Sequence, residues 1–135
     1  MATTLSALGA KVFITSRREE VLKNASDEIT KLTGNQVAYF PSDVRHPDQI
    51  EKAIENCVQQ LGETPTLVVN NAAGNFISPS ERLSPNAVKT IVDIVLLGTL
   101  NTTLLIGKRL IKEEKRILTN ILYKDYILLY CFFSI

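Results

Sequence analysis

The sequence predicts an α/β fold in which parallel strands alternate with helices. Short β-branched segments alternate with longer amphipathic segments in the order helix, strand, helix, strand, helix, strand, helix. This order is typical of a sheet built by right-handed crossovers. The length of 135 residues indicates one domain or part of one. A composition with 45% hydrophobic and 21% charged residues can form a core.

The first four elements are marked by apolar spacing and by glycines. Gly9 stands where a first helix would be closed, and Gly34 closes a second helix whose apolar residues recur at helical spacing. A β-branched strand follows each helix. The predicted ranges are 2–8, 12–15, 18–32 and 37–40.

Three further elements complete the alternation. Pro47 begins a helix with one apolar face, and Gly62 ends it. The continuous apolar segment 66–70 is typical of a strand buried on both faces. Ser84, followed by proline, is a favourable N-cap for a long helix over 84–112.

Charge and cysteine content exclude several classes of protein. The chain has 15 Lys and Arg against 14 Asp and Glu, a formal charge of +1, so we expect no binding to nucleic acid or to an anionic membrane surface. Cys57 and Cys131 form no CxxC motif and no Cys/His cluster, so neither a disulfide framework nor a metal site is expected. A reducing compartment fits this content.

The two ends of the chain differ from the middle. Residues 1–8 have neither the basic start and apolar run of a signal peptide nor the Arg-rich character of a transit peptide, so we find no targeting segment. From Ile117 onward the chain is apolar and aromatic, and we interpret 117–135 as a divergent hydrophobic tail. Its uninterrupted apolar run reaches only about half of the ~20 residues that a membrane span needs, so no span is expected.

Ligands of open α/β sheets bind beyond the carboxyl ends of the strands. The first predicted strand leads into Ser16, Arg17 and Arg18, whose hydroxyl and guanidinium groups can bind a phosphate. The alternative is an ordinary solvated helix start.

The second and third predicted strands also end in polar or small residues. Asp43 can accept a hydrogen bond from an amino group while Val44 packs on a flat ring, although a plain turn or cap is the alternative. The segment 71–75 contains small residues that let a ligand approach the backbone, and Gly74 permits backbone angles that other residues avoid.

These motifs together resemble the short-chain dehydrogenase/reductase superfamily. Asn71-Ala72-Ala73-Gly74 follows a buried strand, and Asp43-Val44 follows the preceding one. The stretch NNAAGNFISPSERLSPNA at 70–87, with SRR at 16–18 and DVRHPD at 43–48, looks like the 2,4-dienoyl-CoA reductases of fatty-acid β-oxidation. Residues 77–79 (Ile-Ser-Pro) are more similar to the mitochondrial enzymes than to the peroxisomal ones.

This resemblance covers about residues 1–115 and implies an incomplete Rossmann-type doubly wound parallel sheet. Residues 1–116 would form a partial NADP-binding domain, and the implied location is mitochondrial. The implied cofactor is NADPH. Arg17, with Ser16 or Arg18, would bind its 2′-phosphate, and Asp43 with Val44 would hold adenine. The inner ribose region would be lined by Asn71, Ala72, Ala73 and Gly74.

The resemblance also implies the residues that would meet a dienoyl-CoA substrate. Asn75 would act in catalysis by bonding the thioester carbonyl, which spreads the negative charge that develops as hydride arrives. The residues bordering the acyl-CoA would be Arg17, Arg45, Phe76 and Ser84.

Several departures from the family pattern predict that this chain alone is inactive. Its six glycines form no Gly-rich phosphate turn, and none of its tyrosines begins the catalytic Tyr-x-x-x-Lys. Leu97 stands where the superfamily usually has asparagine. The resemblance does not extend to the family's first strand or to its C-terminal half.

In the family's sheet order, 3-2-1-4-5-6-7, the absence of the first strand would leave a gap of ~9–10 Å. We therefore expect open strand edges at 12–15 and 66–70, and mostly insoluble material on expression.

The alternative function is a non-catalytic interaction module. The superfamily commonly oligomerises through the helix that corresponds to 84–112, so this helix could pair with full-length reductase subunits or with a second copy.

Overall fold

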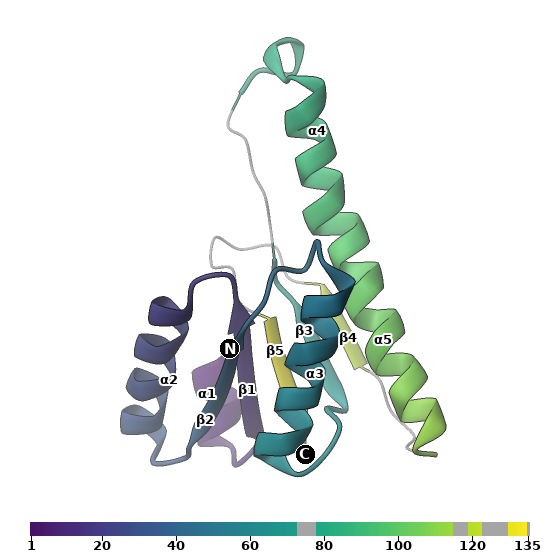
Figure 1. Ribbon diagram of the computed structural model, residues 1–135. Coiled ribbons are helices and arrows are strands. Elements are labelled where there is room, and N and C mark those ends of the chain that lie inside the picture. The colour runs from purple at the N-terminus through teal and green to yellow at the C-terminus, as the bar shows by residue number, and fades with distance from the viewer. Residues whose placement is uncertain (73–77, 115–118, 123–129, 135) are drawn as a thin grey trace.

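The computed structural model describes residues 1–72, 78–114, 119–122 and 130–134, the last two segments as strand backbone (Figure 1). These residues form a five-stranded sheet with helices on both faces. The strand order is β2-β1-β5-β3-β4. The strands are β1 (Lys11–Ser16), β2 (Val37–Pro41), β3 (Leu67–Asn70), β4 (Thr119–Leu122) and β5 (Tyr130–Ser134).

Helices connect the strands as the alternating pattern predicts. The helices are α1 (Ala2–Ala7), α2 (Glu19–Thr33), α3 (Pro47–Leu61), η1 (Ser80–Arg82), α4 (Pro85–Ile91), the π-helical segment η2 (Val92–Leu97) and α5 (Gly98–Lys112). Figure 1 shows α4, η2 and α5 as one long helix that extends past the sheet. The predicted α/β class and the predicted order of the first seven elements are confirmed.

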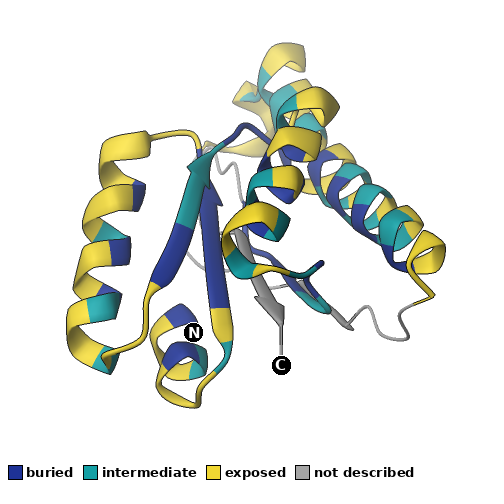
Figure 2. Cartoon of the chain, turned by 60° about the horizontal axis from the view of Figure 1, so that its bottom comes forward, coloured by how far each residue is buried: buried dark blue, intermediate teal, exposed yellow. Residues whose placement is uncertain are grey.

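The sheet separates two apolar cores because successive strand residues point to opposite faces. Val12 and Ile14 of β1 pack with α1 and α2, whereas Phe13 packs with α3 and α5. All three residues are fully buried. Figure 2 shows strand segments between the helices in the dark blue of buried residues. The interior of β1 is therefore covered on both sides, which explains its continuous apolar sequence.

The predicted helix ends are present. Gly34 and Gly62 follow α2 and α3 with φ angles of 73° and 82°, the left-handed conformation that glycine adopts without strain. At the start of α4, the Ser84 hydroxyl oxygen accepts a hydrogen bond from the backbone N–H of Ala87 at 3.2 Å. These caps fix where the helices begin and end relative to the sheet.

The long helix 85–112 is only partly covered. Ile106 and Leu110 are buried against α3, but a set of large apolar side chains is exposed to solvent. By length and composition alone this helix could cross a membrane, a test that helices of soluble proteins also pass. The exposed set is Val88, Val92, Val95, Leu96, Leu97, Leu100, Leu104 and Ile111.

The expectation of open strand edges is wrong. Strand β5 lies between β1 and β3 and runs antiparallel to both, with Phe132 opposite Phe13 and opposite Val68. An antiparallel strand forms a complete ladder with its neighbours, so the backbone groups of β1 and β3 are paired without a parallel strand between them. The segment 117–135, interpreted as a divergent hydrophobic tail, thus supplies two strands of the sheet, β4 and β5.

Candidate functional site

Three parallel strands end at the same edge of the sheet and bring the predicted cofactor residues to one place. Because β5 is antiparallel to both β1 and β3, those two strands run in the same direction, and β2 is parallel to β1. Their last residues are Ser16, Pro41 and Asn70. The polar segments that follow them therefore meet at this edge (Figure 1).

Buried hydroxyl groups fix the ends of β1 and β2. Thr15 Oγ1 donates to the carbonyl oxygen of Phe40 at 2.6 Å, and the Thr15 and Ser42 hydroxyls are 2.8 Å apart. The Ser42 N–H donates to the carbonyl oxygen of Ser16 at 2.8 Å. These bonds set the direction in which the chain leaves each strand, toward Arg17 on one side and Asp43 on the other.

Asp43 forms a bidentate ion pair with Arg45, in which both carboxylate oxygens contact the guanidinium group. Its Oδ1 accepts from the backbone N–H and from Nε of Arg45, both at 3.0 Å, and its Oδ2 accepts from Nη2 at 2.5 Å. The Asp43 side chain is only 12% exposed. The Asp43 N–H in turn donates to Oε1 of Gln49 at 2.9 Å, which ties the loop to α3.

The charges around Asp43 keep its carboxyl ionised. Burial acts to raise the pKa of Asp43, but the hydrogen bonds and charge of Arg45 and the charge of Arg17 outweigh burial, so the pKa lies below its usual value. Two cations thus flank one carboxylate, which at neutral pH remains an acceptor for an amino group. The plain turn that the sequence left as the alternative is formed, because Asp43 Oδ1 accepts from the Arg45 N–H and the Asp43 carbonyl oxygen accepts from the His46 N–H, both at 3.0 Å.

The apolar wall of this edge comes from the segments that follow β2 and β3. Val44 and Ala72 are buried in the same core as Phe13. Asn70 and Asn71, at the end of β3, are also buried. The predicted site residues Ala73, Gly74, Asn75 and Phe76 lie outside the described residues.

Most of the other predicted residues are exposed. Arg17 and Arg18 follow β1 and are exposed, whereas Ser16, the last residue of β1, is buried. Ser84 caps the start of α4, which Figure 1 shows at the end of the long helix that extends past the sheet. The described residues therefore bring Arg17, Asp43, Val44, Arg45 and Asn71 to the edge, and Ser84 stands apart from them.

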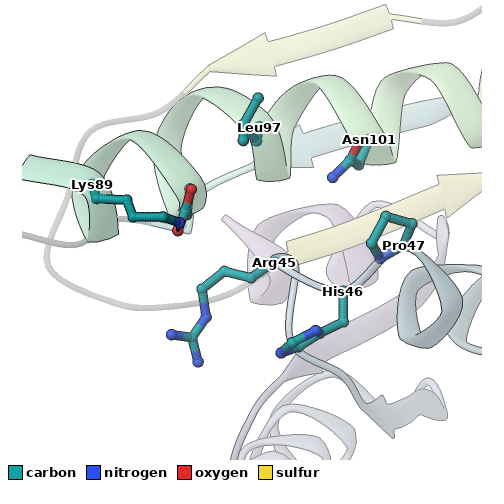
Figure 3. A pocket seen from close by; sticks show the side chains of 7 residues that line it. Arg45, His46, Pro47, Lys89, Leu97 and Asn101 are labelled. Atoms are coloured by element: carbon teal, nitrogen blue, oxygen red, sulfur yellow. Dashed lines mark hydrogen bonds and ion pairs between the residues drawn. The ribbon is translucent and has the colours of Figure 1, made fainter. Parts of the chain in front are cut away.

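A hollow beside this edge contains residues that sequence reasoning did not single out. It has a volume of about 400 Å³ and lies between the loop after Asp43 and one face of the long helix (Figure 3). Lys89 and Asp93 form an ion pair at 2.5 Å on the helix side. Residues 89, 93, 97 and 101 are spaced four apart, which places them along one face of a helix. This spacing is the sequence signal that could have indicated the helix side of the hollow. The lining residues are Arg45, His46, Pro47, Lys89, Asp93, Leu97 and Asn101.

Within the described parts of the chain there is no group of three or more His, Cys, Asp or Glu placed to hold a metal ion. Burial raises the pKa of the Cys57 thiol to about 12, so this cysteine is protonated at neutral pH.

Comparison with known proteins identifies the class to which this fold and site belong. A family model described as short chain dehydrogenase matches residues 1–121, which include β4 except for its last residue. The chain belongs to the short-chain dehydrogenase family. It is an incomplete Rossmann-type α/β unit of that family.

Two relatives narrow the resemblance. The chain is 46% identical over 114 residues to "Probable 2,4-dienoyl-CoA reductase 3" of Caenorhabditis elegans, covering 84% of this chain and 37% of that protein. It is 35% identical over 121 residues to the peroxisomal 2,4-dienoyl-CoA reductase of Danio rerio, covering 90% of this chain and 40% of that protein. The chain thus spans less than half the length of these relatives.

A solved structure supports the fold assignment. A short chain dehydrogenase from Bacillus anthracis superposes with a TM-score of 0.79 at 39% sequence identity, covering 88% of this chain and 49% of that chain. The α/β arrangement described above is therefore that of one part of a family member.

Proposed function

We propose that this chain carries the adenosine-binding part of an NADPH-dependent reductase related to the 2,4-dienoyl-CoA reductases. Residues 1–116 form a partial NADP-binding domain in this proposal, and 117–135 are a divergent segment. The convergence of Arg17, Asp43 and Val44 at one sheet edge is the observation that carries it. The 46% identity to a protein named as such a reductase supports the substrate class.

Each residue at the edge has a proposed task in binding the adenosine part of NADPH. The ionised Asp43 accepts a hydrogen bond from the adenine amino group, and Val44 packs against the ring. Arg17, beside Ser16 and Arg18, binds the 2′-phosphate, and no acidic residue stands directly at the end of β1 to prefer a 2′-hydroxyl. Asn71 and the residues to Gly74 line the ribose.

The substrate assignment rests on the resemblance. Asn75 bonds the thioester carbonyl of a dienoyl-CoA, and Arg45, Phe76 and Ser84 border the acyl-CoA. Polarising that carbonyl stabilises the negative charge that forms when hydride arrives, and a bound nicotinamide cofactor would supply the hydride. We propose that the process is mitochondrial fatty-acid β-oxidation, because the sequence at 77–79 is more similar to that of the mitochondrial enzymes.

The chain alone is proposed to be inactive. It has no Tyr-x-x-x-Lys, and a positioned proton donor contributes ~10²–10⁴-fold to a rate. The test is to incubate the purified chain with NADPH and a dienoyl-CoA and to follow NADPH oxidation by absorbance. We expect no turnover above a boiled control, and measurable turnover would disprove inactivity.

The exposed apolar face of helix 85–112 favours one alternative function. A chain with this face could pair with full-length reductase subunits as a non-catalytic module. Co-purification of a tagged copy with a full-length reductase would support pairing. Substituting Leu96 and Leu100, which are 54% and 46% exposed, by Glu should abolish it.

A further inference from the structure

A groove runs between α3 and α5, on the face of the sheet to which Phe13 points. The two helices lie side by side and run in the same direction (Figure 1), because α3 leads into β3 and α5 into β4, which are parallel strands. The groove has a volume of about 480 Å³, and its apolar lining is the buried Ile54 and the half-buried Leu105. It shares no lining residue with the hollow beside the strand edge.

The two walls of this groove carry opposite charges. The acidic wall on α3 presents Glu51 and Glu55, and the basic wall on α5 presents Lys108 and Lys112. All four residues are exposed. Within the described parts of the chain, none of the four takes part in an ion pair, so no ion pair joins the two walls.

Each wall repeats one charge at a spacing of four residues. Residues four apart on a helix are neighbours, so the two carboxylates of the acidic wall repel each other, and so do the two ammonium groups of the basic wall. The other charged groups of the groove are already paired, because Arg109 Nε donates to Oε1 of Glu113 at 3.0 Å. Opposite charges from outside the chain would therefore stabilise both walls.

A second copy of this chain supplies those charges. A two-fold axis parallel to the groove keeps the direction of the helices and places the α3 wall of each copy against the α5 wall of the other. Both acidic walls then face basic walls. An axis across the groove would instead place like charges together, so the charge pattern selects the first arrangement.

We infer that two copies of this chain associate through the groove, with Glu51 and Glu55 of one copy facing Lys108 and Lys112 of the other. This contact differs from the exposed apolar face of the long helix, because α3 supplies half of it, and it does not depend on the proposed cofactor. A stable interface has about 20–30 residues on each side, whereas eight residues line the groove. We therefore expect a weak, reversible dimer that salt disrupts.

The groove contact is measured apart from the exposed apolar face. Every chain is the full 135-residue protein with Leu96→Glu and Leu100→Glu, which remove the apolar contact. Sodium chloride at about 50 mM retains the groove contact, and about 500 mM should weaken it about tenfold by screening. Tests of the apolar face itself are therefore made at the higher salt concentration.

Reversing the charge of one wall at a time tests this dimer. The acidic-wall variant carries Glu51→Lys and Glu55→Lys, and the basic-wall variant carries Lys108→Glu and Lys112→Glu. In either variant alone the facing walls have the same sign, so sedimentation equilibrium at low salt should show dimerisation about tenfold weaker than that of the unreversed chain. An unreversed chain that stayed monomeric at about 1 mM, or a reversed variant that dimerised equally, would overturn the inference.

An equimolar mixture of the two variants is the decisive measurement. One chain then has two basic walls and its partner has two acidic walls, so both contacts of the pair become attractive. We expect a heterodimer whose dissociation constant is within about threefold of that of the unreversed dimer. A mixture that stayed monomeric, while circular dichroism showed both chains folded, would contradict the assignment.

Milder variants and a matched control complete the test. Glu55→Gln and Lys108→Gln each remove one exposed charge and should weaken the dimer about threefold, so the inference fails if neither has an effect, whether or not the reversed chains fold. Lys23→Glu with Lys31→Glu reverses two exposed charges on α2, which packs on the other face of the sheet, and should leave the dimer unchanged. An equal loss in this control would show that net charge alone, and not the groove, governs association.

Discussion

Asp43 is the residue on which the candidate site depends most. Its position after the second strand was predicted from the sequence, because a carboxylate followed by valine stands where ligands of α/β sheets bind. Its bidentate contact with Arg45 was not predicted, since the side chains of two residues that are two positions apart can face each other or diverge. The same holds for Lys89 and His46, which line one hollow because the long helix passes the loop after Asp43.

The Asp43→Asn variant should be less stable than the original chain at neutral pH. It removes a charge-assisted bond from a buried site, which costs about 1–3 kcal/mol. The folded-state pKa of Asp43 is lowered, so its ionised form contributes stability above the unfolded pKa of ~3.9 that is lost as pH falls through the folded pKa. Urea unfolding at pH 7 and pH 3 should show a difference that shrinks in acid. Asp27→Asn, on the exposed face of α2, is the control, and a difference that grew in acid would contradict this account.

The Ser84 cap gives a second prediction. Ser84→Ala removes the acceptor for the Ala87 N–H at the start of α4, which should lower the free energy of unfolding by about 1 kcal/mol. Ser80→Ala, in the preceding short helix, should have a smaller effect. Equal effects in thermal unfolding would show that the cap is not formed.

The helices and first three strands were predictable because their signals are local. Apolar spacing, Gly34, Gly62 and the Ser84 cap each act within a few residues, and the predicted boundaries agree with the structure within about two residues. Strand β5 was missed because its place depends on pairing across more than one hundred residues of chain. Nothing in the composition of 117–135 indicates which gap a strand will occupy.

The insertion of β5 can be tested at the backbone. Phe132→Pro removes an N–H from the middle of a central strand, where proline is not accommodated, whereas Phe132→Ala keeps that N–H. We expect the proline variant to be at least about 1–3 kcal/mol less stable than the alanine variant in denaturant unfolding. Equal stability of the two variants would mean that residue 132 takes no part in the ladder.

The molecule as a whole carries an uncovered apolar face on one helix. The proposed oligomerisation through 84–112 follows from this face, since large apolar patches on soluble proteins usually mark contact surfaces. The near-neutral charge of +1 gives little repulsion between copies.

Self-association should therefore depend on that face. Leu96→Glu and Leu100→Glu should shift the chain toward monomer in sedimentation velocity experiments. Leu8→Glu introduces the same charge at a leucine that is 78% exposed and lies outside the long helix, and it should leave the association unchanged. Association that persisted in the double variant, or that Leu8→Glu abolished equally, would rule out this face as the contact.

The position of β5 also fixes when the fold can be completed. In the sheet order, β2 and β1 form one pair and β3 and β4 another, and β5 is the strand that joins the two pairs. Residues 130–134 leave the ribosome after the other four described strands, so during synthesis those strands wait with unpaired edges. Pairing residue 11 with residue 134 also gives the sheet a high contact order, which slows folding. Slow release of the newly made chain from chaperones, rather than instability of the finished fold, is the consequence we expect in cells.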